Sequence, residues 1–126
     1  MYKNMKNAKE TSNIKIIDAS GRTLGRVASE AAMSLMGKTK VSFERNKYSG
    51  IPVKIVNASK LRITPQKLES IYHTRYSGIP GGLRVIKGTE TAAKMGLKEL
   101  LKLATEQMLP SNKLRRDMMK NLTITD

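Results

Sequence analysis

Two arginines flank the beginning of a predicted helix and could bind an anion. Arg22 and Arg26 lie in the segment Ser-Gly-Arg-Thr-Leu-Gly-Arg, residues 20–26. Close to a helix N-terminus the macrodipole disfavours a cation by about 0.3–1 kcal/mol, so a compensating anion is expected there. A phosphate fits this position, because it accepts hydrogen bonds from guanidinium groups and from free backbone N–H groups. The alternative, equally open from these residues alone, is that both arginines extend into solvent.

A glycine-rich segment offers a second position for anion binding. Residues 75–84 read Arg-Tyr-Ser-Gly-Ile-Pro-Gly-Gly-Leu-Arg. We expect an irregular loop whose backbone approaches another backbone closely, with the two flanking arginines binding phosphates. The Gly-Gly pair could instead serve only a tight turn with positive φ. The candidate RNA contacts in and around this loop are Lys67, His73, Arg75, Tyr76, Ser77, Gly78, Pro80, Gly81, Gly82, Arg84 and Lys87.

Two further segments concentrate cations. In residues 38–50, Phe43 and Tyr48 accompany four cations and could stack on bases, or could anchor the loop to the core. In residues 111–120, Ser-Asn can cap a helix whose first turn is again crowded with cations. The candidate RNA contacts from these segments are Lys38, Lys40, Arg45, Lys47, Asn112, Lys113, Arg115, Arg116 and Lys120.

The residues needed for catalysis do not form a recognisable set. The chain has no cysteine and His73 is its single histidine, which excludes disulfides and thiolate metal sites. The glycine spacing matches neither a P-loop nor a dinucleotide-binding turn. Asp18 follows a predicted strand, where catalytic residues of α/β enzymes lie, but a turn carboxylate close to Arg22 is the favoured interpretation. We expect no enzyme, no cofactor and no metal.

The elements that position these residues follow from hydrophobic periodicity. An apolar strand is predicted over 14–17, and a helix that Gly37 ends follows it. Further strands are predicted over 51–57, 66–74 and 122–125, and helices from 89 to Pro110 and over 113–120. Strand, turn and helix in this order predict an α/β fold with a mainly parallel sheet. The apolar stripes are Leu24, Val27, Ala28, Ala31, Ala32, Leu35 and Met36 in the first helix, and Leu97, Leu100, Leu101, Ala104 and Met108 in the second.

Length and charge describe one basic domain. The 126 residues carry 24 Lys and Arg against 10 Asp and Glu, a net charge of +14. Eleven of the cations and only two of the acids lie in residues 38–87, which indicates a polyanionic partner. We expect a polar N-terminal arm over 1–13 and a single domain over 14–126. No apolar run suggests a membrane span or a signal peptide, so a soluble, intracellular protein is expected.

Five blocks of sequence together resemble the bacterial form of the L13 family of large-subunit ribosomal proteins. They lie at residues 18–29, 36–38, 56–60, 77–84 and 108–116. The resemblance implies a three-layer α/β/α fold around a four-stranded, mostly parallel sheet. It also implies a structural protein that binds large-subunit (23S-type) rRNA and supports subunit assembly. Such a protein would be a monomer within a cytoplasmic or organelle ribosome, beside other large-subunit proteins, with no membrane and no small-molecule substrate.

The resemblance assigns RNA-facing positions and also shows departures. The matching positions are Arg22, Arg26, Lys38, Ser77, Gly78, Pro80, Gly81, Gly82, Arg84, Asn112, Lys113 and Arg116. Departures from the family pattern are Ile14, Pro65-Gln66, Ile79, Gln107 and Arg115, and the usual C-terminal tail is absent, so its contacts would be missing or supplied by a neighbour. Two alternatives stay open: a free RNA-binding translational regulator acting on mRNA, and a small nucleotide-directed enzyme centred on Asp18.

Overall fold

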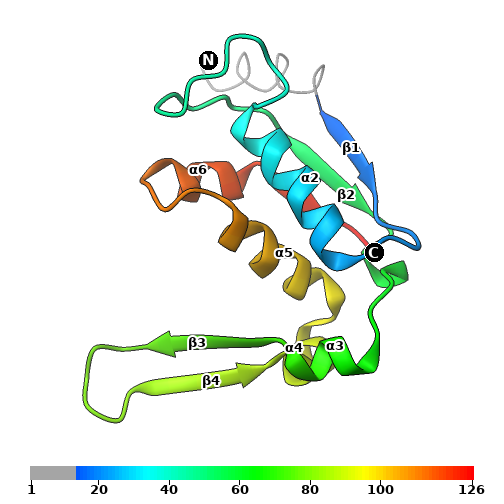
Figure 1. Cartoon of the computed structure of the whole chain (residues 1–126), viewed down its shortest axis with the longest axis vertical. Coiled ribbons are helices and arrows are strands. Elements are labelled where there is room, and N and C mark those ends of the chain that lie inside the picture. Colours follow the sequence, from blue (N-terminus) through cyan, green and yellow to red (C-terminus); the bar gives the residue numbers. More distant parts are fainter. Residues whose placement is uncertain (1–13) are drawn as a thin grey trace, which may run out of the picture.

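The computed structural model describes residues 14–126, and the predicted arm of residues 1–13 lies outside them. Helices and strands alternate through the first half of the chain, and helices dominate the second (Figure 1). The elements are β1 (Lys15–Asp18), α2 (Leu24–Met36), β2 (Val53–Val56), the 3₁₀ turn η2 (Ala58–Lys60), α3 (Pro65–Ser70), β3 (Tyr72–Tyr76), β4 (Leu83–Lys87), α4 (Gly88–Met95), α5 (Leu97–Met108), α6 (Leu114–Lys120) and β5 (Leu122–Ile124).

Helix α2 forms as its periodicity predicts. Its apolar stripe is buried from Leu24 to Leu35, and Met36 is partly buried against the same cluster. Gly37 ends the helix in the left-handed conformation (φ +79°), and its N–H donates to the carbonyl of Ser34 at 3.1 Å. Glycine adopts this conformation without the steric penalty that a side chain brings. The predicted helix and its end are therefore confirmed.

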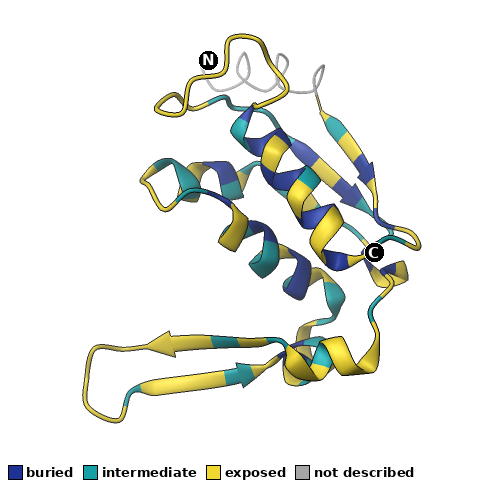
Figure 2. Cartoon of the chain, in the orientation of Figure 1, coloured by how far each residue is buried: buried dark blue, intermediate teal, exposed yellow. Residues whose placement is uncertain are grey.

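The α/β class is confirmed, with a parallel sheet of order β1-β2-β5. Alternation along the strands buries Ile17, Val53 and Ile55 on the face that α2 covers, whereas Ile16 and Lys54 on the other face are exposed (Figure 2). Within residues 14–126 the sheet thus has three strands and one covered face, where the resemblance implied four strands and three layers. The other two strands form a separate antiparallel pair.

The prediction of a strand over 66–74 is wrong in its first half. Residues Pro65–Ser70 form helix α3, and only the part from Tyr72 onward is a strand. Thr64 caps this helix, because its Oγ1 accepts the N–H of Lys67 at 3.3 Å, and Pro65 occupies the first helical position. This Thr-Pro start is a helix signal that outweighs the apparent alternation of the residues after it.

The irregular loop predicted over 75–84 is observed for its central six residues, and its two ends belong to the strands of a β-hairpin. Strands β3 and β4 pair antiparallel from Tyr72 opposite Lys87 to Tyr76 opposite Leu83, so only residues 77–82 are loop. The hairpin extends away from the body of the molecule, and most of its residues are exposed (Figures 1 and 2).

The predicted second helix is two helices. Gly96, at φ +82° and ψ 177°, separates α4 from α5. Helix α5 then packs against α2, with Leu100 and Leu101 buried in the same core as the α2 stripe. The last helix and strand, α6 and β5, lie within a residue or two of their predicted bounds, and Met118 of α6 completes the core.

Candidate nucleic-acid interface

The first cationic hollow, here the α2 hollow, lies at the beginning of α2 and has a volume of about 440 Å³. Three cations line it, with no carboxylate among its lining residues: Arg26, Arg62 and Lys67. The backbone N–H of Arg62 donates to the carbonyl of Arg22 at 2.9 Å, which fixes this segment beside the helix. Gly25 also lines the hollow, and a Cβ at this residue would meet no atom within 4 Å. A phosphate can therefore approach both the cations and the helix backbone.

The expected convergence of Arg22 and Arg26 on one anion is not what the structure shows. Nη1 of Arg22 lies 2.7 Å from Oε2 of Glu30, two turns into α2. Lys15 of β1 lies 3.9 Å from the same carboxylate, so Glu30 is shared between two cations. Arg22 therefore has a protein partner, and Arg62 takes the place beside Arg26 that was expected for Arg22.

Asp18 is a turn carboxylate. Its Oδ1 accepts the backbone N–H of Ser20 and the side-chain amide of Asn57, both at 3.0 Å. The hydrogen bond from Ser20, followed by that from Asn57, holds the pKa of Asp18 below its ordinary value. This exposed carboxylate, with two fixed donors, joins β1 to the residue after β2, and its lowered pKa makes it poorly suited to take up a proton in catalysis.

The second cationic hollow, here the hairpin hollow, lies at the loop end of β3 and β4. Its volume is about 410 Å³, and Arg75 and Arg84 line it together with loop residues. These two arginines are directly opposite each other in the strand register. Like charges at such positions are destabilising, and among the described residues no carboxylate pairs with either of them. An anion between the two guanidinium groups would remove this repulsion.

The glycines of the hairpin loop are required for two different physical reasons. Gly78 and Gly81 have φ of +83° and +80°, the left-handed region that glycine favours. Gly82 does not; instead, a Cβ there would overlap the Oγ of Ser77 and lie 3.0 Å from the carbonyl oxygen of Ile79. The loop's own atoms thus fill the space beside Gly82 in which an RNA backbone was expected. A positive φ does not explain this residue, whereas the contacts that a Cβ would make with Ser77 and Ile79 do.

The two faces of the hairpin differ. Tyr72, Tyr76, Leu83 and Val85 share one exposed face, as the alternation and the register of the strands require. His73 lies on the other face, where its Nδ1 is 3.3 Å from the side-chain amide nitrogen of Gln107 in α5. With Nδ1 as the acceptor, the proton is on Nε2, which is buried and has no partner among the described residues. His73 therefore faces the helices.

The third cationic hollow, here the α6 hollow, lies between α5 and the beginning of α6, with a volume of about 580 Å³. Asn112 caps α6, because its Oδ1 accepts the N–H groups of Leu114 and Arg115, each at 3.1 Å. The cap fixes the backbone from which the neighbouring cations extend, and Glu106 is the single carboxylate among the lining residues. The cations that line it are Lys102, Lys113, Arg115 and Arg116.

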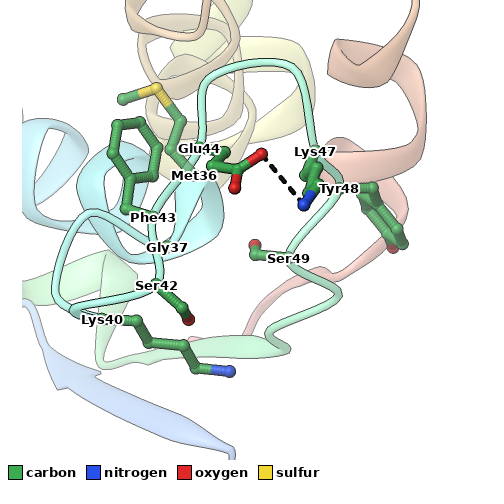
Figure 3. Close-up of a pocket in the computed structure, with 9 residues that line it drawn as sticks. All are labelled: Met36, Gly37, Lys40, Ser42, Phe43, Glu44, Lys47, Tyr48 and Ser49. Carbon is green, nitrogen blue, oxygen red and sulfur yellow. Dashed lines mark ion pairs between the residues drawn. The ribbon is translucent and has the colours of Figure 1, made fainter.

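The loop of residues 38–50 surrounds a fourth hollow of about 330 Å³ (Figure 3). Lys47 faces Glu44 across it, with Nζ 3.0 Å from Oε2 (Figure 3). Tyr48 anchors the loop, since its hydroxyl accepts from the amide of Asn121 and donates to the carbonyl of Asp117 at 3.5 Å. The anchoring alternative is therefore the one observed for Tyr48. The cations Lys38, Lys40 and Arg45 are exposed.

Comparison with known proteins identifies the family. The sequence model of the family described as Ribosomal protein L13 matches residues 12–125, nearly the whole chain. The chain belongs to the ribosomal protein L13 family. Its relatives include the large ribosomal subunit protein uL13 of Moorella thermoacetica, 42% identical over 109 residues that cover 86% of this chain and 75% of the relative. The uL13 proteins of Thermus thermophilus (41% identical; 86% and 77% covered) and Aquifex aeolicus (39%; 86% and 75%) are further examples.

Most of the L13-family positions line one of the three cationic hollows: Arg26, Ser77, Gly81, Gly82, Arg84, Asn112, Lys113 and Arg116. Gly78, Pro80 and Lys38 lie in loops outside these linings, and Arg22 pairs with Glu30 instead. Of the cations expected from charge alone, Lys120 pairs with Asp117 at 3.7 Å, and Lys87 lies at the base of the hairpin. Sequence reasoning missed Gly25, Arg62 and Lys102. The alternating Leu-Arg-Ile at residues 61–63 was a usable signal for Arg62.

Metal-binding clusters and membrane-spanning helices are absent from the described residues of this L13-family chain. In residues 14–126, no three His, Asp or Glu side chains cluster closely enough to hold a metal ion. Among the same residues, every helix is too short or too polar to traverse a lipid bilayer.

Proposed function

We propose that this L13-family chain is a structural constituent of the large ribosomal subunit that binds large-subunit rRNA, supports subunit assembly and performs no catalysis. Its relatives bear the name of large ribosomal subunit proteins, and its cations gather in hollows that suit phosphates. It acts as one copy per cytoplasmic ribosome, beside neighbouring large-subunit proteins, without cofactor, membrane or small-molecule substrate.

The observation that carries the proposal is the opposed pair Arg75 and Arg84. An isolated protein gains nothing from two guanidinium groups facing each other at the end of an exposed hairpin. A nucleic acid backbone supplies the missing negative charge, and guanidinium groups bind phosphate in a bidentate geometry. The loop end of the hairpin thus offers an anion-binding position, because no carboxylate among the described residues forms an ion pair with either arginine.

Each of the three cationic hollows contributes separate phosphate contacts to RNA binding. Arginines and lysines that contact phosphates fix the position and orientation of a protein on RNA without reading its bases. Arg26, Arg62 and Lys67 act at the beginning of α2, Arg75 and Arg84 on the hairpin, and the α6 segment at the third position. Contacts from separate elements to one folded RNA would hold rRNA segments together, which is how the chain supports assembly.

The test compares the variant Arg75→Gln/Arg84→Gln with Lys98→Gln. Lys98 is also cationic, but it pairs with Asp126 at 3.5 Å on α5, away from all three hollows. We expect the double variant to lose at least tenfold in affinity for large-subunit rRNA, because a hydrogen bond to a charged group contributes about 1.5–3 kcal/mol. Lys98→Gln should bind within about twofold of the parent. Equal affinity of the double variant and the parent in filter binding would contradict the proposal.

Sedimentation separates the proposal from the free-regulator alternative. A constituent of the large subunit co-sediments with assembled large subunits at high and low salt, and the Arg75→Gln/Arg84→Gln protein does so less. A free regulator of mRNA stays at the top of the gradient. Finding the parent chain mainly at the top would favour the regulator.

A further inference from the structure

A hollow of about 230 Å³ lies between the inner face of the hairpin and helices α4 and α5. We call it the α4–α5 hollow. Its apolar wall is formed by Ile86 of β4, Met95 of α4 and Leu103 of α5, and Met95 is 62% exposed. In Figure 1 the hairpin and these helices come from successive stretches of the chain and meet near the base of the hairpin. The space suits one apolar or aromatic side chain.

The charges around this hollow differ from those of the three cationic hollows. Glu90 and Glu99 both line it, and neither has an ion-pair partner among the described residues. Its cations are Lys94 and Arg75, so acids and bases are equal in number. The α2 and hairpin hollows have no carboxylate, and the α6 hollow has one against four cations. Two free carboxylates repel an RNA backbone.

We propose that the α4–α5 hollow docks a polypeptide segment of a neighbouring protein, in which an apolar or aromatic side chain is flanked by lysine or arginine. The apolar wall takes the central side chain, and the flanking cations pair with Glu90 and Glu99. An apolar centre with a charged rim is the usual composition of a protein interface. The inference rests on the proposed function in one respect: RNA bound at the hairpin engages Arg75, which leaves two carboxylates against Lys94.

Desolvation and charge select this occupant over RNA. A phosphate placed here would lie beside two carboxylates that form no ion pair within the described residues, and its own solvation would be lost against Ile86 and Leu103. The net charge of +14 repels a cationic segment over most of the surface, whereas two neighbouring glutamates without an ion-pair partner among the described residues attract it at this hollow. The pair of glutamates beside an apolar wall therefore distinguishes this hollow from the three cationic ones.

The first experiment uses the peptide Lys-Arg-Trp-Lys-Arg as the probe. The chain contains no tryptophan, so the emission of the peptide reports binding alone. We expect a saturable blue shift with the parent chain and at least a fivefold weaker affinity with Glu90→Gln/Glu99→Gln. Glu69→Gln is the matched control, because Glu69 is an exposed and unpaired glutamate of α3 outside the hollow. Met95→Ser should also weaken binding. No blue shift with the parent, or equal binding by the double variant, overturns the inference.

The second experiment works in assembled large subunits and separates protein from RNA as the occupant. The chain has no cysteine, so Met95→Cys and Ser77→Cys each carry a unique thiol for a benzophenone cross-linker. We expect Met95→Cys to cross-link to a protein peptide that contains lysine or arginine beside an apolar residue. That cross-link should decrease when Glu90 and Glu99 are also replaced by glutamine. A cross-link from Met95→Cys to rRNA overturns the inference and leaves the proposed function standing. Absence of rRNA cross-links from Ser77→Cys counts instead against the proposed function.

Discussion

Replacing Gly25 with alanine should stabilise the free protein and weaken its binding to RNA. Gly25 is the second residue of α2, its φ is not positive, and an added Cβ meets no atom within 4 Å. Alanine is favoured over glycine in a helix by about 0.5–1 kcal/mol, so the free energy of unfolding should rise by up to this amount. For a chain of this size such an increase raises Tm by roughly 2–5 °C.

The methyl group has the opposite effect on RNA. It projects into the α2 hollow beside Arg26, Arg62 and Lys67, where a phosphate must approach the helix backbone. The displaced phosphate loses part of one charged hydrogen bond, which corresponds to roughly a tenfold lower affinity at about 1.4 kcal/mol. Because stability and affinity move in opposite directions, partial unfolding cannot produce the combined result.

Thermal unfolding followed by circular dichroism and filter binding to large-subunit rRNA measure the two effects. Ser29→Ala is the control, since Ser29 is an exposed residue of the same helix outside the α2 hollow, and alanine there also favours the helix. Ser29→Ala should leave RNA affinity unchanged. If Gly25→Ala binds RNA as tightly as the parent does, RNA does not approach the beginning of α2, and the α2 hollow is not an RNA contact.

Four further predictions follow from the same structure. The affinity for large-subunit rRNA should fall with salt, with a log–log slope of about −4 to −5 for about six phosphate contacts; a slope near zero in filter binding excludes phosphate-dominated recognition. Leu101→Ala, in a fully buried position, should lower the free energy of unfolding by about 2–5 kcal/mol in denaturant titration and leave the affinity of the folded protein for RNA unchanged; unchanged stability would remove α5 from the core. Gly82→Ala should reduce hydrogen-exchange protection in the hairpin, and Ser77→Gly should restore it, because the clash is with Ser77; absence of restoration would place the clash elsewhere. The pKa of Asp18 is lower in the folded chain than in the unfolded chain, so its stabilising contribution is present above the unfolded value and is lost as the pH falls through the folded one; Asp18→Asn should therefore destabilise at pH 7 and have a smaller effect near pH 2, and an equal effect at both would contradict the role of the ionised carboxylate.

Elements that bury a continuous stripe could be predicted from the sequence. Helix α2 was predicted with its end, because seven apolar residues at helical spacing and a following glycine leave few alternatives. The hairpin could not be predicted in the same way. Strand β4 exposes four of its five residues, so no alternation between a buried and an exposed face marks it as a strand. Its pairing with β3 supplies the regularity, and pairing is a tertiary property.

The sequence predicted that the candidate site is cationic, but it did not predict which cations form ion pairs within the chain. The sequence placed the cations of 38–87 near RNA, but it could not show that Arg22 pairs with Glu30, because the two residues lie eight positions apart across a helix start. Arg62 was overlooked because the alternation Leu-Arg-Ile around it is too short to predict a strand, and an isolated bridge with Thr23 brings it beside Arg26. Ion pairs and contacts of this kind decide which cations are available to bind RNA.

The exposed hairpin links these features to the energetics of binding. A two-stranded hairpin is at best marginally stable in water, and this one leaves Tyr72, Tyr76, Leu83 and Val85 more than half exposed. Its base is fixed by the hydrogen bond from Gly88 to the carbonyl of Ile71 at 2.7 Å, whereas its loop end carries two opposed arginines. An anion at that end lowers the repulsion, and a partner on either face covers apolar surface. A partner that binds the paired hairpin at either position therefore stabilises it, and binding of one partner favours binding of the other.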